Sequence, residues 1–243
     1  MVLILFALLP IGKMSSLSVS ADGFIIQELN QDEYESALLR WSDKIILLNE
    51  EPDLKFEIQN VAVNEDGMFA ICTDFLGIYI IEVYNSEGEF QYGYKFTMSG
   101  KAYVDWMEDR IVIYSVRGDE AIVLDSNGKI LEILEVSDTI KNSEYIRKEL
   151  TQTEKSVNGY TYTLNRKVDF LWDIFLPYPK LIITDVFGNI NFVYTANYWV
   201  VLFPYLSCLF VIVGFLVVMV IAFLKYKKRA MNFDGGVFDF HSL

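Results

Sequence analysis

Carboxylates are the residues of this sequence whose types and positions could do chemistry. Two carboxylates on either side of a cleft can hydrolyse a glycosidic bond, one as general acid and the other as base or nucleophile. Five carboxylates lie close to predicted turns, namely Asp105, Glu108, Asp109, Asp119 and Glu120. No spacing among them selects a pair, so we interpret them as solvated turn residues and keep a carboxylate-dependent glycan hydrolase as an alternative function.

Other catalytic and metal-binding patterns are weak or missing. His241 is the only histidine, and it lies beyond the membrane span predicted below. Histidine-dependent catalysis and His-ligated zinc are therefore excluded on the other side of that span. Asp125-Ser126-Asn127-Gly128 resembles the start of a calcium loop, but the bidentate glutamate at loop position 12 is missing, so we prefer a hairpin turn. We expect no cofactor, name no catalytic or metal-binding residue, and favour a non-enzymatic function.

Charge restricts the partners of the chain. Residues 22–197 contain 31 Asp and Glu but only 15 Lys and Arg, a net charge of −16. Nucleic acid is excluded as a partner because phosphate binding depends on clustered cations. The same charge repels an anionic lipid surface. A cationic ligand, a basic partner or divalent ions remain compatible with it.

The stretch Tyr198–Leu224 predicts a transmembrane helix. It has 27 residues and no charge, and about 20 apolar residues suffice to cross a bilayer. Its flanks carry the residues expected of a membrane anchor, with Tyr198 and Trp199 before it and Lys225, Lys227, Lys228 and Arg229 after it. Basic residues favour the cytoplasmic side. The sequence therefore predicts a single-pass protein of the cell membrane, with residues 22–197 extracellular and residues 225–243 as a short basic cytoplasmic tail.

The first 21 residues predict a signal peptide. Met1–Gly12 is apolar but too short to span comfortably, and Val19-Ser20-Ala21 offers small residues for cleavage after Ala21. No Lys or Arg precedes the apolar run, so an uncleaved anchor is the alternative. Cys72 is then the only cysteine outside the membrane, which excludes an internal disulfide in the extracellular domain. We expect Cys72 to be a buried small apolar residue.

Local signals predict a strand, one helix and another strand at the start of the extracellular domain. Phe24–Leu29 is apolar and β-prone, and Lys44–Leu48 is similar. Between them, Asn30 is a good N-cap with Glu33 three residues later. The spacing of Tyr34, Ala37, Leu38 and Trp41 gives this helix one buried face. A polar run over Ile140–Glu154 suggests a helical insertion further on.

A repeated pattern dominates the rest of this domain. An apolar strand, Asn or Asp, two residues, Gly and one more residue recur from Asn85, from Asp125 and from Asp185. The Asx side chain and the glycine are suited to a tight hairpin. A preceding hairpin also recurs, since Glu65–Ile71 resembles Glu108–Ile113. Two hairpins make a four-stranded meander of about 40 residues, which is typical of a β-propeller blade. An open meander or a sandwich is the competing all-β architecture.

The two clearest repeats also support a family resemblance. The runs EVYNSEGEFQYGYKF and IVIYSVRGDEAIVLDSNGKILEI are similar to those of uncharacterised exported or membrane-anchored proteins of Firmicutes with propeller-like repeats. The resemblance covers Val61–Tyr194 and rests on turn and strand signals. It implies an all-β fold and a place at the cell surface, and it implies no activity.

Aromatic residues offer the candidate interaction surface. Seven of them crowd the two clearest repeats, and cross-strand packing is the preferred interpretation of Tyr79, Tyr84, Tyr92, Tyr94, Tyr103, Trp106 and Tyr114. As candidates for contact with a partner we name Trp106, Trp172, Phe175 and Tyr178. The favoured hypothesis is a cell-surface binding or interaction module, in contact with the lipid bilayer and with a membrane-protein or envelope partner. A structural accessory subunit of a membrane complex is a further alternative.

Overall fold

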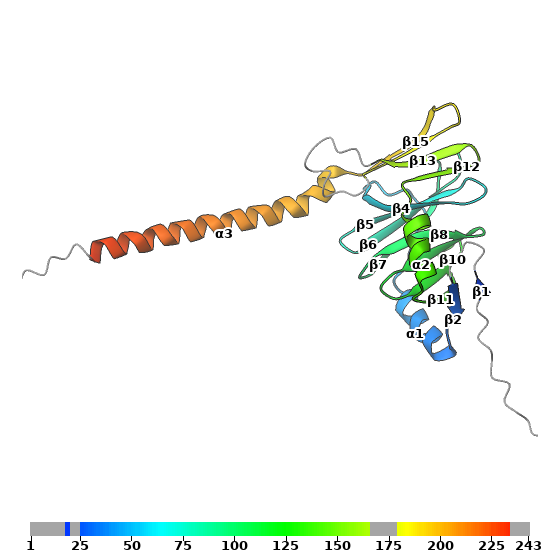
Figure 1. Cartoon of the computed structure of the whole chain (residues 1–243), viewed down its shortest axis with the longest axis horizontal. Helices are drawn as coiled ribbons and strands as arrows, with labels where there is room; N and C mark the ends of the chain where they lie inside the picture. Colours follow the sequence, from blue (N-terminus) through cyan, green and yellow to red (C-terminus); the bar gives the residue numbers. More distant parts are fainter. Residues whose placement is uncertain (1–17, 20–24, 166–178, 234–243) are drawn as a thin grey trace, which may run out of the picture. The chain divides into compact units, whose positions relative to one another are not determined.

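The structure is a computed structural model that describes residues 18–19, 25–165 and 179–233, in two units (Figure 1). The first unit is Met1–Asn197 and the second is Tyr198–Leu243. In its described part the first unit consists mainly of β-strands, and the second is one helix, α3 (Tyr198–Phe233). The prediction of an all-β domain followed by a C-terminal helix is confirmed at this level.

Three antiparallel sheets make up the described part of the first unit. The β4–β7 sheet contains β3 (Ile46–Leu48), β7 (Phe90–Thr97), β6 (Ile78–Tyr84), β5 (Phe69–Phe75) and β4 (Glu57–Val63), in that order. The β8–β11 sheet contains β1 (Ser18–Val19), β2 (Ile25–Glu28), β11 (Ile130–Val136), β10 (Glu120–Leu124), β9 (Arg110–Ser115) and β8 (Ala102–Met107). The β12–β15 sheet contains β12 (Glu154–Val157), β13 (Tyr160–Asn165), β14 (Lys180–Thr184) and β15 (Ile190–Thr195). Each sheet thus includes a four-stranded meander, and among the described residues the three sheets do not close into a ring.

The three predicted Asx turns are present, and each joins the last two strands of a meander. Asn85 Oδ1 accepts hydrogen bonds from the backbone N–H groups of Glu87 at 3.1 Å and Glu89 at 2.9 Å. Asp125 and Asp185 accept the same pair of bonds in their own turns. The glycine of each turn has a φ between 78° and 84°, which side chains with a Cβ rarely adopt. Local chemistry therefore fixes these hairpins, as the sequence predicts.

A fourth turn of the same kind joins β4 to β5. Asn64 Oδ1 accepts from the backbone N–H groups of Asp66 at 3.1 Å and Met68 at 2.8 Å. The hairpin between β8 and β9 is different, because Met107 pairs directly with Arg110 and leaves only two residues in the turn. The sequence similarity between the Glu65–Ile71 and Glu108–Ile113 hairpins therefore does not extend to their turns.

The core consists of layers between and beside the sheets. One cluster lies between the β4–β7 and β8–β11 sheets and includes Tyr79, Tyr94, Phe96, Ile111, Ile113 and Ile122. A second lies between the β4–β7 and β12–β15 sheets and includes Phe69, Tyr84, Tyr162, Leu181 and Tyr194. A third lies on the other face of the β8–β11 sheet. The β4–β7 sheet is therefore the central layer, buried on both faces.

Three short helical segments complete the β domain. Helix α1 (Gln31–Ser42) begins with the predicted capping box of Asn30 and Glu33, and it buries Ala37 and Trp41. The predicted insertion forms α2 (Ile140–Tyr145) and one π-helical turn, η1 (Ile146–Leu150), which pack on the third core cluster. Glu154, the last residue of the predicted insertion, is instead the first residue of β12.

The second unit contains the predicted membrane segment. Within α3, residues Leu206–Tyr226 are long and apolar enough to cross a membrane, and none of this stretch is buried inside the protein. The helix begins where the predicted span Tyr198–Leu224 begins and continues beyond its end. Most of the predicted signal peptide lies outside the described residues, although Ser18 and Val19 form β1 and pair with β2.

Candidate functional site

One depression of the β domain is a cleft of about 840 Å³ to which all three sheets contribute. β4 contributes Val63 and the turn that follows it, β8 contributes Asp105 and Trp106 and the next turn, and β12 lines the cleft over its whole length. Tyr145 of α2 and Glu149 of η1 complete the lining. β4, β8 and β12 are the first strands of their meanders and belong to three different sheets. The packing of these sheets therefore forms the cleft.

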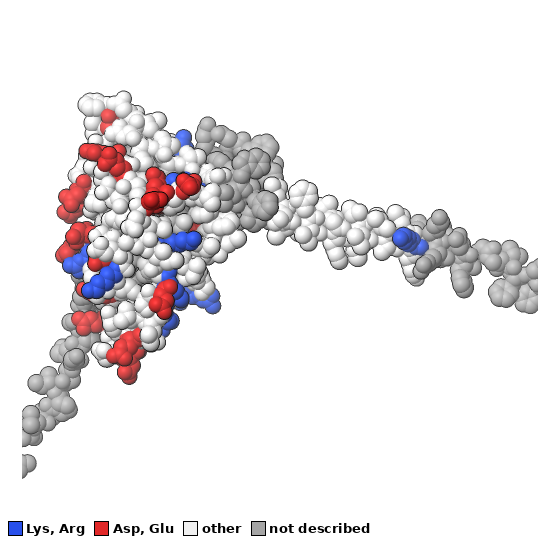
Figure 2. Space-filling view, turned by 180° about the vertical axis from the view of Figure 1, so that it is seen from behind, with Lys and Arg blue, Asp and Glu red and all other residues white. Residues whose placement is uncertain are grey.

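Negative charge is concentrated around this acidic cleft. Its seven carboxylates are Glu65, Asp66, Asp105, Glu108, Asp109, Glu149 and Glu154. Arg110 lies outside the lining, 3.7 Å from Glu108 and 3.9 Å from Asp109 between charged atoms, and such exposed pairs contribute little. Acidic side chains are spread over the face of the domain shown in Figure 2, but the cleft brings this number together around one concave surface, which attracts a cationic group.

One cation, Lys155, lies among these carboxylates. Burial lowers the pKa of its ammonium group, while the negative charges of Asp105 and Glu149 oppose that shift. Within the described part of the chain, Lys155 forms no ion pair. Lys155 therefore reduces the negative potential of the cleft without being fixed to one carboxylate.

The cleft places Asp105 by two hydrogen bonds. The hydroxyl of Tyr145 donates to Asp105 Oδ2 at 2.8 Å, and the backbone N–H of Trp106 donates to Asp105 Oδ1 at 3.0 Å. Asp105 thereby connects β8 to α2, two elements about 40 residues apart in the chain. The bond from Tyr145 joins two walls of the cleft.

Trp106, one of the predicted candidates for contact with a partner, is mostly buried. Only 6% of its surface is exposed, and it belongs to the core between two sheets. It also lines the cleft, and its indole Nε1 is buried without a hydrogen-bond partner. A buried N–H without an acceptor destabilises a fold by about 1–3 kcal/mol. Its burial follows from strand alternation, since Val104 and Trp106 both belong to the same core cluster.

The predicted carboxylates separate into two groups. Asp105, Glu108 and Asp109 meet in the acidic cleft, whereas Asp119 and Glu120 line other depressions near α1. Sequence reasoning missed the contributions of the Asn64 turn between β4 and β5, of η1 and of β12. No local signal could have found them, because sheet packing brings them together across about 90 residues of chain.

The other residues that the sequence singles out are placed as follows. Trp172, Phe175 and Tyr178 lie outside the described residues. Tyr198, Trp199, Lys225, Lys227, Lys228 and Arg229 lie in α3. Of the tyrosines predicted to pack in strands, Tyr92 is half-buried, and the others are buried, namely Tyr79, Tyr84, Tyr94, Tyr103 and Tyr114. Cys72 is buried and free, as predicted.

The carboxylates of the cleft are mostly exposed. A carboxyl group acts as a general acid near neutral pH when burial raises its pKa. In the cleft Asp105 is half-buried, and the other six carboxylates are exposed. Among the described residues there is also no group of three His, Cys, Asp or Glu side chains placed to hold a metal ion. The described side chains therefore supply charge and shape.

No protein-family model matches the chain, and no curated protein matches it in sequence.

Proposed function

We propose that this chain is a membrane-anchored binding protein whose acidic cleft takes a positively charged segment of a partner protein. The single observation that carries the proposal is the cleft itself, which gathers seven carboxylates and one lysine from three sheets. Side chains of Lys or Arg would enter the cleft and replace the mutual repulsion of the carboxylates by attraction. Its volume of about 840 Å³ lies in the range of about 300–1,000 Å³ typical of ligand sites.

Trp106 supplies a second, neutral element of recognition. Its indole N–H requires an acceptor, and a peptide offers backbone carbonyl groups as well as cationic side chains. A small movement of the bound segment or of the indole would complete this bond. A basic peptide therefore matches both the charge and the missing acceptor better than an isolated cation does.

The proposed location is the cell surface. Leu206–Tyr226 is apolar and long enough to serve as the anchor, and Lys225, Lys227, Lys228 and Arg229 follow the predicted span. Basic flanks favour the cytoplasmic side, which would leave the β domain outside. We further propose that the three meanders are propeller-like blades, with the cleft beside their first strands. An accessory subunit of a membrane complex would use the same cleft to hold its partner.

The test is binding of a fluorescent synthetic peptide of alternating Lys and Gly to the full-length protein in detergent micelles. We expect Glu149→Gln with Glu154→Gln to weaken binding about 10-fold, because two cleft charges are lost. The matched control, Glu87→Gln with Glu132→Gln, removes two exposed carboxylates outside the cleft and should leave the affinity within about 2-fold. Equal effects of the two double variants would show non-specific attraction and contradict the proposal.

Trp106→Phe tests the neutral element in the same assay. The substitution keeps an aromatic ring in the core and removes the N–H group. We expect a loss of peptide affinity of about 3- to 10-fold, since a hydrogen bond formed on binding disappears. Unchanged affinity with a folded variant would remove Trp106 from the site while leaving the acidic cleft in place.

A further inference from the structure

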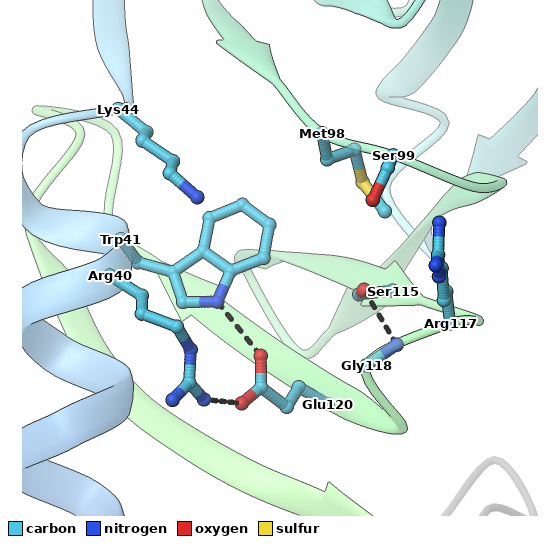
Figure 3. Close-up of a pocket in the computed structure, with 9 residues that line it drawn as sticks. All are labelled: Arg40, Trp41, Lys44, Met98, Ser99, Ser115, Arg117, Gly118 and Glu120. Carbon is cyan, nitrogen blue, oxygen red and sulfur yellow. Dashed lines mark hydrogen bonds and ion pairs between the residues drawn. The ribbon is translucent and has the colours of Figure 1, made fainter.

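A second depression, the Trp41 pocket, carries the opposite charge. It has a volume of about 320 Å³ and lies between the end of α1, the loop after β7 and the turn between β9 and β10 (Figure 3). Its cations are Arg40, Lys44 and Arg117, and its single carboxylate is Glu120. In a domain with a net charge of −16, this is an exceptional local excess of positive charge.

Glu120 is already engaged in the wall of the pocket. Its Oε2 atom accepts from Trp41 Nε1 at 2.9 Å, and its Oε1 atom pairs with the guanidinium group of Arg40. Lys44 and Arg117 form no ion pair within the described part of the chain. Two cationic groups thus remain available after the internal pair is satisfied.

The two available cations approach from different walls. Figure 3 shows Lys44 beside the Trp41 indole on one side and Arg117 with Ser99 on the other. Lys44 Nζ lies 5.6 Å from the centre of the Trp41 ring, which holds the ammonium group near the pocket. Cationic donors on two walls suit a tetrahedral oxyanion, whereas a planar carboxylate can be bound by one arginine alone.

The floor of the pocket depends on Gly118 and Ser115. Ser115 is 4% exposed, and its Oγ accepts from the backbone N–H of Gly118 at 3.3 Å. A Cβ at Gly118 would lie 2.9 Å from Ser115 Oγ and 3.3 Å from Glu120 Oε2. A side chain at Gly118 would therefore displace Ser115 or Glu120 from its place in the pocket wall.

A neighbouring acidic depression limits the size of an anionic ligand. It shares Arg40, Gly118 and Glu120 with the Trp41 pocket, and it is lined by Asp32 and Asp119 among other carboxylates. A polyanion extending across this boundary would be repelled. A small anion that stays within about 320 Å³ would not.

We propose that the Trp41 pocket binds a phosphoryl group, carried either by free phosphate or by a small phosphomonoester. Arg117 and Lys44 hold the dianion from opposite sides, and the hydroxyl of Ser99 can add a hydrogen bond. Met98 and the edge of Trp41 give the pocket an apolar side, against which the carbon skeleton of a phosphomonoester packs. This proposal is independent of the acidic cleft, since the two sites share no residue.

Isothermal titration calorimetry of the full-length protein in a phosphate-free maltoside detergent tests the proposal. The probes are inorganic phosphate, glycerol 3-phosphate and acetate. We expect millimolar binding of the two phosphates and binding of acetate at least about 10-fold weaker. Tighter binding of glycerol 3-phosphate assigns a phosphomonoester, and equal binding assigns free phosphate. Binding of acetate as tight as that of phosphate, or binding of no probe at about 50 mM, would overturn the proposal.

Variants locate the binding. Arg117→Gln should weaken phosphate binding about 10-fold or more, because one charge-assisted contact is lost. Lys129→Gln, which removes an exposed lysine outside the pocket, is the matched control and should have no effect. Gly118→Ala should also weaken binding, because its Cβ would push Ser115 or Glu120 out of place, and its circular dichroism shows whether it is folded. Phosphate binding unchanged in both Arg117→Gln and a folded Gly118→Ala protein would refute the site.

Discussion

The acidic cleft and the Trp41 pocket carry opposite charges and are built differently. Six of the seven cleft carboxylates are exposed, and the only cation of the lining, Lys155, forms no ion pair among the described residues. Among the described residues that line the pocket, the one negative charge belongs to the buried Glu120, which is bonded to Arg40 and Trp41. In the proposed sites, the cleft would attract its ligand by many exposed charges, and the pocket would bind its ligand by a few groups in fixed positions. Removing Glu120 from the pocket should therefore affect stability more than removing Lys155 from the cleft does.

Glu120→Gln should have the largest effect on folding. The variant keeps an oxygen for the indole of Trp41 and removes the charge that pairs with Arg40. We expect the free energy of unfolding to fall by about 2 kcal/mol, a value between those of exposed and buried pairs. Phosphate affinity should rise because the only negative charge of the pocket disappears. Denaturant unfolding followed by tryptophan fluorescence measures the first effect, and calorimetry measures the second.

Glu132→Gln is the matched control for that prediction, since Glu132 is exposed and lies in neither site. Unfolding curves of Glu120→Gln that coincide with those of the control would show that the ion pair contributes nothing. Glu120 would then stabilise the fold no more than Lys155 does, and the proposed difference between the two sites would be wrong.

Acid should strengthen the fold through Glu57. Burial, followed by the negative charge of the cross-strand neighbour Asp74, raises the pKa of Glu57 to about 7. This pKa is above that in the unfolded chain, so its stabilising contribution is complete below about pH 4.5 and is lost as the pH rises through 7. We expect unfolding free energy to be about 1 kcal/mol higher at pH 5.5 than at pH 8.

Glu57→Gln provides the control for this pH effect, since it cannot ionise and should flatten the dependence. A wild-type protein and a Glu57→Gln variant with the same pH profile of stability would disprove the role of Glu57.

Lys155→Gln should give the smallest effect. The variant removes the only cation that lines the cleft, so basic-peptide affinity should rise about 3-fold. Stability should change by less than about 0.5 kcal/mol because no described ion pair is broken. Lys148→Gln removes an exposed lysine of η1 outside the cleft lining and serves as the control. A drop in peptide affinity with Lys155→Gln would mean that the lysine itself contacts the ligand.

The sequence predicts those parts of the fold that depend on neighbouring residues. The Asx turns at Asn85, Asp125 and Asp185 are predictable because each side chain bonds backbone within four residues. The α1 cap is predictable for the same reason, since Asn30 and Glu33 bond each other's backbone. Aromatic residues in strands pack in the core as expected.

The arrangement of the sheets and both candidate sites could not be predicted in this way. Asn60 illustrates the reason, because its side chain bonds the backbone of Val104 on another sheet at 2.7 and 2.9 Å. Nothing in the residues around Asn60 specifies that partner. Trp106 shows the same limit, since its strand predicts an aromatic residue at a sheet surface but not which sheet covers it. Glu120 was identified as a turn carboxylate, and its ion pair with α1 depends on packing across 80 residues.

The most direct test of the acidic cleft is to map where a basic peptide binds on the full-length protein. A Lys-Gly peptide carrying a photoreactive diazirine would be cross-linked in detergent, and mass spectrometry would identify the modified residues. We predict cross-links concentrated in residues 63–66, 105–109 and 149–157, which line the cleft, and their loss in the Glu149→Gln with Glu154→Gln variant. Cross-links spread evenly over acidic surfaces, and unchanged in that variant, would contradict the proposed function.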